Sequence, residues 1–134
     1  MKTHTLVATT LAGLVLAALG LGIAFAASAG RSSAETQARV VVGEFFQTIN
    51  ARRFARTCDL LSSRFYRENH VPDRRHCVLG LSVGFAMSPS VRFRIVDVRT
   101  EGDLTIVQAL ANGAAGRIVL VRETGGFKVL SVGS

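Results

Sequence analysis

The chain has 134 residues, a formal net charge of +7 and 49% apolar residues. It contains no P-loop and no G-x-G-x-x-G motif after a predicted strand, which excludes the common nucleotide-binding classes. Only two histidines, His70 and His76, follow the apolar N-terminus, with no third ligand in view. The sequence therefore predicts no metal site and no cofactor.

Residues 1–29 consist of a short basic start followed by an apolar segment, residues 6–29. Two small-residue triplets, 24–26 and 27–29, fit the A-x-A pattern of signal-peptide cleavage. Uncleaved, residues 6–29 would span a roughly 30 Å hydrocarbon core at about 1.5 Å per helical residue and so contact the membrane. The segment therefore predicts either a cleaved signal peptide or a single transmembrane anchor. Both outcomes place the rest, about 100 residues and one small domain, outside the cytoplasm.

A polar linker, residues 30–35, precedes a first predicted helix at about residues 36–50. Apolar side chains recur on this helix at spacings of three and four residues, which is the pattern of one buried face. They are Ala38, Val41, Val42, Phe45, Phe46 and Ile49. A second helix is predicted at about residues 52–61, and residues 62–72 are polar and typical of a turn.

A third predicted helix, at about residues 74–87, begins after Asp73, a favourable N-cap residue. Gly80 and Gly84 weaken this helix and predict the close approach of another backbone. Cys58 and Cys77 lie in the second and third helices. In an oxidising compartment they predict one disulfide that joins these helices, and two free buried thiols are the alternative.

Near residue 91 the spacing of apolar residues changes from the helical period to the alternation that is typical of strands. Residues 91–95 alternate apolar side chains with Arg92 and Arg94, and the apolar phase then inverts at Val96 and Val98. Such a slip predicts a β-bulge, which bends a sheet. Further strands are predicted at residues 104–111, 115–122 and 127–132, with a hairpin at Asn112-Gly113. Helices followed by a four-stranded antiparallel meander define an α+β domain.

Three features carry a family resemblance. They are Val40–Asn50 together with Phe54–Ser62, the later Cys77, and Ile118–Val129, in which Phe127 follows a glycine turn. In these features residues 36–133 resemble the NTF2-like superfamily, in particular the small exported SnoaL-like and DUF4878-like proteins of actinobacteria. The resemblance implies a cone, in which N-terminal helices pack on a strongly curved antiparallel sheet of about four strands around a pocket. It also implies the Cys58–Cys77 bond, and homodimers through the sheet face are common in the family.

Catalytic NTF2-like enzymes use a buried Asp or His base with Tyr or Asp donors, and this chain offers few candidates. The three weak candidates are His76, which has Asp73 or Asp59 nearby, Asp97, which would have to be turned inward by the bulge, and Tyr66. Each has a structural alternative as a helix cap or a surface residue. The sequence therefore assigns no catalytic residue and leaves these three as weak candidates.

Binding is the alternative to catalysis. The aromatic residues expected to line the core and any cone are Phe45, Phe46, Phe54, Phe85 and Phe93. Arg92 and Arg94, with Arg74 and Arg75, would form a cationic patch for an anionic ligand or a membrane surface. The simpler interpretation of the two strand arginines is the charged outer face of an edge strand. An extracytoplasmic location excludes nucleic acid as the expected partner.

The sequence thus favours an exported, non-catalytic NTF2-like domain that binds a small apolar ligand or a cell-envelope partner protein. Two alternatives stay open. One is a small-molecule isomerase, dehydratase or cyclase that uses the cone pocket. The other is a membrane-anchored accessory subunit of an envelope complex, which an uncleaved segment 6–29 would favour.

Overall fold

The computed structural model describes residues 33–134. The predicted signal peptide or anchor, residues 1–29, lies outside the described residues. Within residues 33–134, no helix has the length and apolar character needed to cross a membrane. Residues Glu35–Ser134 pack together as one unit, and they contain every element discussed below except the first two residues of the N-terminal helix.

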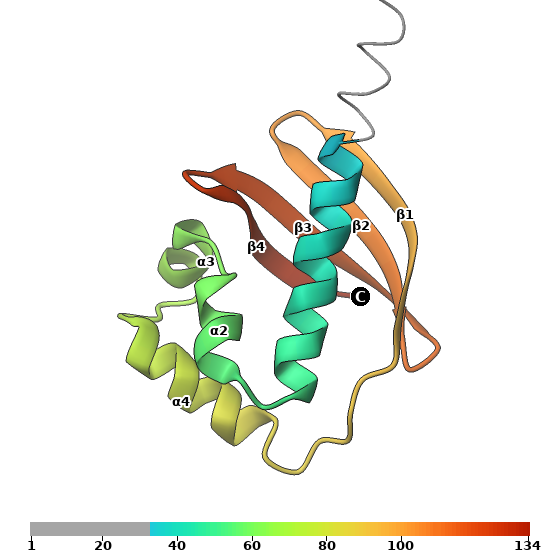
Figure 1. Cartoon of the computed structure of the whole chain (residues 1–134). Helices are drawn as coiled ribbons and strands as arrows, with labels where there is room; N and C mark the ends of the chain where they lie inside the picture. Colours follow the sequence, from blue (N-terminus) through green and yellow to red (C-terminus); the bar gives the residue numbers. More distant parts are fainter. Residues whose placement is uncertain (1–32) are drawn as a thin grey trace, which may run out of the picture. The chain divides into compact units, whose positions relative to one another are not determined.

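The N-terminal helix, residues 33–50, crosses one face of the sheet (Figure 1). Its apolar residues repeat at helical spacing, and the positions that face the sheet are buried: Ala38, Val42, Phe45, Phe46 and Ile49. The helix already includes residues 33–35, so the second half of the predicted linker is helical. The apolar face predicted from the sequence is confirmed, and it anchors the helix on the sheet.

Three shorter helices follow: α2 (Phe54–Asp59), α3 (Ser63–Glu68) and α4 (Arg74–Gly84). Helix α4 begins as predicted, because the Asp73 side chain accepts a hydrogen bond from the backbone N–H of His76. Helix α3 was not predicted. It forms in the segment expected to be a turn, where the buried Ser62 caps it by accepting a hydrogen bond from Phe65 N–H.

The predicted meander is confirmed. Strands β1 (Phe93–Glu101), β2 (Leu104–Ala111), β3 (Ala114–Glu123) and β4 (Gly126–Gly133) pair antiparallel in the order β1-β2-β3-β4. The predicted bulge lies between Ile95 and Asp97, and Val96 at this point is 56% exposed. A second bulge, which was not predicted, lies where β3 changes register against β4 between Val119 and Leu120.

The core fills the space between the N-terminal helix and the inner face of the sheet. The sheet contributes fully or almost fully buried side chains to it, among them Val107, Ile118, Leu120 and Val129. Backbone hydrogen bonds also join the chain after α2 to β4: Val129 N–H donates to Leu60 O, and Ser62 N–H donates to Val129 O. The predicted fold class, an α+β domain with helices on an antiparallel sheet, is therefore confirmed.

The end of the N-terminal helix holds the connection between α4 and β1. The Asn50 side chain makes two hydrogen bonds to the backbone of Val91, at 2.9 and 2.8 Å. Arg52, which has a positive φ of 59°, donates from its guanidinium to the carbonyl oxygens of Phe85 and Ser88. These bonds place the loop and the start of β1 against the helix terminus.

Candidate functional site

The five predicted core phenylalanines all lie in or against the core. Phe45, Phe46 and Phe54 are buried, whereas Phe85 and Phe93 are partly buried. Rings from the helix and the sheet meet directly, since Phe46 stacks on Phe93 with 4.8 Å between ring centroids. Phe45 meets the Phe46 ring edge-on, at 5.5 Å. These rings pack between the N-terminal helix and β1.

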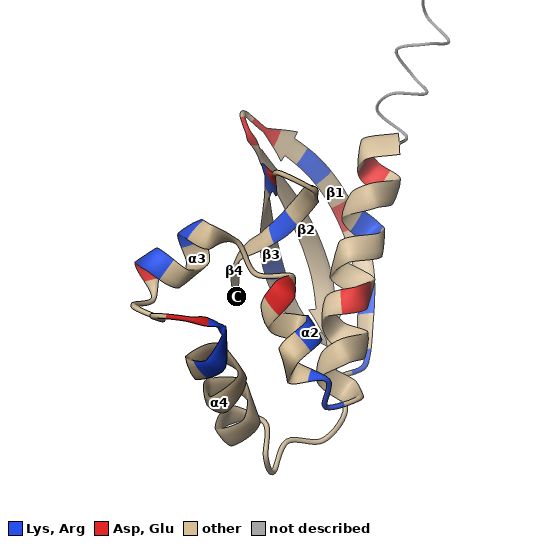
Figure 2. Cartoon of the chain, turned by 60° about the vertical axis from the view of Figure 1, so that its left-hand side comes forward, with Lys and Arg blue, Asp and Glu red and all other residues tan. Residues whose placement is uncertain are grey.

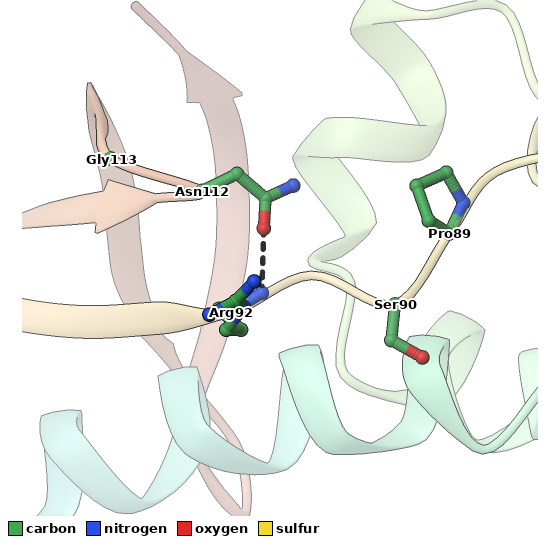
Figure 3. A pocket seen from close by; sticks show the side chains of 5 residues that line it. All are labelled: Pro89, Ser90, Arg92, Asn112 and Gly113. Carbon is green, nitrogen blue, oxygen red and sulfur yellow. Dashed lines mark hydrogen bonds between the residues drawn. The ribbon is translucent and has the colours of Figure 1, made fainter.

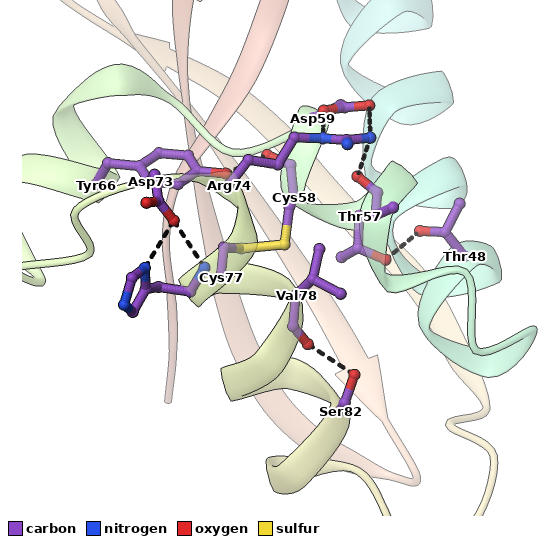
Figure 4. The surroundings of a disulfide bond; sticks show 12 residues. Thr48, Thr57, Cys58, Asp59, Tyr66, Asp73, Arg74, Cys77, Val78 and Ser82 are labelled. Atoms are coloured by element: carbon purple, nitrogen blue, oxygen red, sulfur yellow. Dashed lines mark hydrogen bonds and ion pairs between the residues drawn. A yellow bond between two sulfur atoms is a disulfide. The ribbon is translucent and has the colours of Figure 1, made fainter.

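The predicted disulfide between Cys58 and Cys77 is present, and it joins α2 to α4 (Figure 4). Both cysteines are buried, with 1% and 6% of their surface exposed. Tyr66 lies beside this bond, and its hydroxyl donates to the carbonyl oxygen of Cys58 at 3.0 Å. Burial raises the pKa of Tyr66. The only tyrosine of the chain therefore supports the disulfide region, where its hydroxyl is occupied.

His76 pairs with Asp73 and not with Asp59. One carboxylate oxygen of Asp73 accepts from the backbone N–H of His76 at 2.9 Å and lies 2.7 Å from its Nδ1. The hydrogen bond from the backbone of His76 is the main reason that the pKa of Asp73 is lowered. Both side chains are more than half exposed. This arrangement is that of a helix cap at the surface.

Asp59 binds Arg74 in a two-point ion pair, with distances of 2.6 and 3.0 Å. The hydrogen bond from Arg74 is the main cause that lowers the pKa of Asp59. The pair links the end of α2 to the start of α4, beside the disulfide. It is a structural ion pair between the two helices that the disulfide also joins.

Asp59→Asn is expected to destabilise the fold at neutral pH but not in strong acid. A carboxylate whose pKa is lower in the folded state contributes stability that is fully present above its unfolded value, about 3.9, and is lost as the pH falls through the folded value. The gap in urea midpoint between the parent protein and Asp59→Asn should therefore close below about pH 4. In an Arg74→Gln background, Asp59→Asn should change the urea midpoint only slightly at every pH. A gap that stayed constant down to about pH 2 would contradict this assignment.

Asp97 lies on the outer face of β1. It is exposed and pairs in register with Gln108, whereas its neighbour Val98 pairs with the fully buried Val107. The bulge therefore does not turn Asp97 toward the core. The structure does not bring the three candidates together, because Asp97 faces outward on β1. Tyr66 lies near Asp73, the partner of His76, and the Asp73 charge contributes to the raised pKa of Tyr66 (Figure 4).

One motif was missed in the sequence. Gly80-Leu81-Ser82-Val83-Gly84 matches the G-x-S-x-G pattern of a nucleophile elbow, which needs a sharp turn between a strand and a helix. Here the match lies inside α4, and the Ser82 hydroxyl donates to the carbonyl oxygen of Val78 at 2.7 Å. The match is therefore coincidental. The prediction that Gly80 and Gly84 admit another backbone is wrong for the described residues, since a Cβ at either would meet nothing within 4 Å.

The four arginines of the predicted cationic patch do not share one hollow. Arg74 and Arg75 border a hollow with Val78 and Ser82 on α4. Arg92 borders another, with Pro89, Ser90, Asn112 and Gly113, where Asn112 Oδ1 accepts from Arg92 N–H at 2.9 Å (Figure 3). Arg94 is exposed on β1, which is an edge strand. Basic residues lie on helices and strands alike (Figure 2).

A third hollow was not predicted. It is a groove of about 550 Å³ between the first half of the N-terminal helix, α2 and the β3–β4 hairpin. We call it the hairpin groove. Its apolar lining consists of Val40, Val41, Leu60 and Phe127, and its charged lining consists of Glu44, Arg56, Arg122 and Lys128. Tyr66, His76 and Asp97 line none of these three hollows.

Comparison with solved structures identifies the fold. A candidate dehydratase of the NTF2-like family from Streptomyces avermitilis matches with a TM-score of 0.56 and 13% sequence identity. The match covers 75% of this chain and 94% of that one. No family profile and no curated protein sequence matches the chain. The fold is therefore NTF2-like, and an identity this low supports the fold alone.

Proposed function

We propose that this protein is an exported, non-catalytic domain with the NTF2-like fold, and that it binds a small apolar ligand in the hairpin groove. We further propose that it belongs to the exported SnoaL-like and DUF4878-like proteins of actinobacteria. The apolar segment 1–29 and the Cys58–Cys77 disulfide support export, because disulfides persist in oxidising compartments.

The observation that carries the proposal is the composition of the groove. Leu60 and Phe127 are core residues with only 5% and 7% of their surface exposed, and both border the groove. Val40, which is 61% exposed, and Val41 extend this apolar surface along the N-terminal helix. Small-molecule sites combine apolar side chains with polar groups that fix the ligand. In this groove the four apolar residues lie beside six polar or charged ones: Thr36, Gln37, Glu44, Arg56, Arg122 and Lys128.

A catalytic role has less support. A general acid or base has to lie within hydrogen-bond reach of a substrate, in a site that shifts its pKa toward its task. His76 and Asp73 form an exposed helix cap, Tyr66 is bonded to the backbone of Cys58, and Asp97 faces outward. The alternative is an enzyme, such as the dehydratase for which the matched structure is named. Catalysis of this kind would require a cavity that contains one of these groups.

The groove is tested with an uncharged apolar dye, N-phenyl-1-naphthylamine, whose fluorescence rises in apolar surroundings. We expect saturable binding to the parent protein, and about a tenfold weaker affinity for Val40→Trp, in which the larger ring fills the groove. Val96→Trp is the matched control, because Val96 is 56% exposed and lies on β1, away from the groove. Equal weakening in both variants, or no saturable binding at all, would overturn the proposal.

Export is tested separately by the intact mass of the protein purified from its host. Loss of the residues before position 27 or 30 identifies a cleaved signal peptide, and the full mass in the membrane fraction identifies an anchor. Full-length protein recovered from the cytoplasm would contradict export. The same preparation under native conditions shows any small molecule that the protein retains.

A further inference from the structure

We propose that the hairpin groove selects an amphiphile with one carboxylate at the end of an apolar chain, and that Arg122 binds the carboxylate. The inference rests on the proposed function, since it specifies the ligand of the same groove.

The guanidinium of Arg122 lies over an aromatic ring. It lies opposite Phe127 in the pairing of β3 with β4, and its guanidinium carbon is 4.3 Å from the centre of the Phe127 ring. A guanidinium carries its N–H donors around the edge of its plane, where they match the two oxygens of a carboxylate. Among residues 33–134 no acidic group forms an ion pair with Arg122.

The other charges of the groove are already engaged. Arg56 donates to Glu44 at 2.6 Å, and Lys128 Nζ donates to the carbonyl oxygen of Asp59 at 2.7 Å. Three cations against the single carboxylate of Glu44 leave the lining with a net charge of +2. The groove therefore attracts an anion, and Arg122 is the cation whose donors are directed to no acidic partner in the described part of the chain.

The apolar residues exclude a bare anion as the preferred ligand. Val40, Val41 and Leu60 border the same groove as Arg122, so a ligand that reaches the arginine with its head can cover these side chains with its chain. Burial of each methylene group from water favours binding. A volume of about 550 Å³ lies within the usual range for small-molecule sites. A medium-chain fatty acid combines the required head and chain.

The test compares three competitors for the bound dye: decanoate, decanol and acetate. We expect decanoate to displace the dye at a concentration about tenfold lower than decanol, because a charge-assisted bidentate pair adds that much affinity. Acetate, which has the head without the chain, should displace none. In Arg122→Gln the advantage of decanoate over decanol should disappear while decanol binds unchanged. Arg117→Gln, at another exposed arginine of β3, is the matched control and should keep the advantage.

The outcomes separate the two proposals. Equal displacement by decanoate and decanol in the parent protein would overturn the carboxylate preference and leave the groove as an apolar site. A decanoate advantage that survives in Arg122→Gln would overturn the role of Arg122. Displacement by neither compound would overturn the proposed function as well. Unchanged circular dichroism and urea midpoints establish that the variants are folded.

Discussion

Replacing Phe46 with alanine should lower the free energy of unfolding by about 3–5 kcal/mol, which is the usual cost of removing a buried phenylalanine ring. Phe46 is 6% exposed, stacks on Phe93 and meets the edge of Phe45, so its removal leaves a cavity between the N-terminal helix and β1. Urea unfolding followed by circular dichroism measures the loss. The surrounding rings can close the cavity only in part, because they belong to different elements.

Phe46→Leu is the matched variant, since it keeps an apolar side chain at the position and should lose much less stability. An apolar cavity of this kind stays dry and accepts small apolar molecules, so benzene should raise the melting temperature of Phe46→Ala and leave that of the parent protein unchanged. A melting temperature of the parent that rose equally with benzene would show that an open cone already exists. A loss below about 1 kcal/mol would show that the rings do not fill the interior.

Removing the disulfide is expected to have the second large effect. Cys58→Ala/Cys77→Ala should destabilise the protein by roughly 3 kcal/mol, because the bond closes a loop between residues 19 apart and restricts the unfolded chain. The loop contains all of α3 and the Asp73 cap, so α4 would lose its covalent link to α2. Urea unfolding of the oxidised parent and of the double variant gives the difference.

Reduction provides the control. Dithiothreitol should shift the unfolding midpoint of the parent toward that of the double variant and leave the double variant where it is. Dye binding in the hairpin groove should be retained by the variant under conditions where it is folded, since neither cysteine lines the groove. A midpoint shift within the error of the measurement would show that the bond does not support the fold.

Local signals account for what could be predicted of the fold. The Asn112-Gly113 turn, the Asp73 cap and the bulge at Val96 each depend on a few adjacent residues, and all are present. Asn112 and Gly113 both have positive φ, as their hairpin turn requires. Helix α3 was missed because its residues show no helical apolar period. It is held by contacts with distant parts of the chain, such as the bond from Ser62 to β4.

The candidate site could be predicted only in part, for a related reason. The disulfide was predicted from two cysteines and from an N-terminal segment with the pattern of an export signal or anchor. The hairpin groove, in contrast, combines residues near positions 40, 60 and 122–128, and nothing in these separate segments distinguishes a groove from the core. The sequence placed Val41 on the apolar face of the first helix and Phe127 after a glycine turn, and it assigned no role to Arg122. Their juxtaposition is a property of the tertiary structure.

The two edges of the sheet differ in a way that limits how copies of this chain can join. Residues 60–62 bond to the backbone of Val129, so the outer side of β4 is interrupted near its middle. Within residues 33–134 the outer side of β1 has no such bridge, and the bulge between Ile95 and Asp97 lies in this strand. A sheet with one open edge can accept one further sheet at most. Pairing through β1 alone therefore joins two copies and leaves neither of them a second free β1 edge.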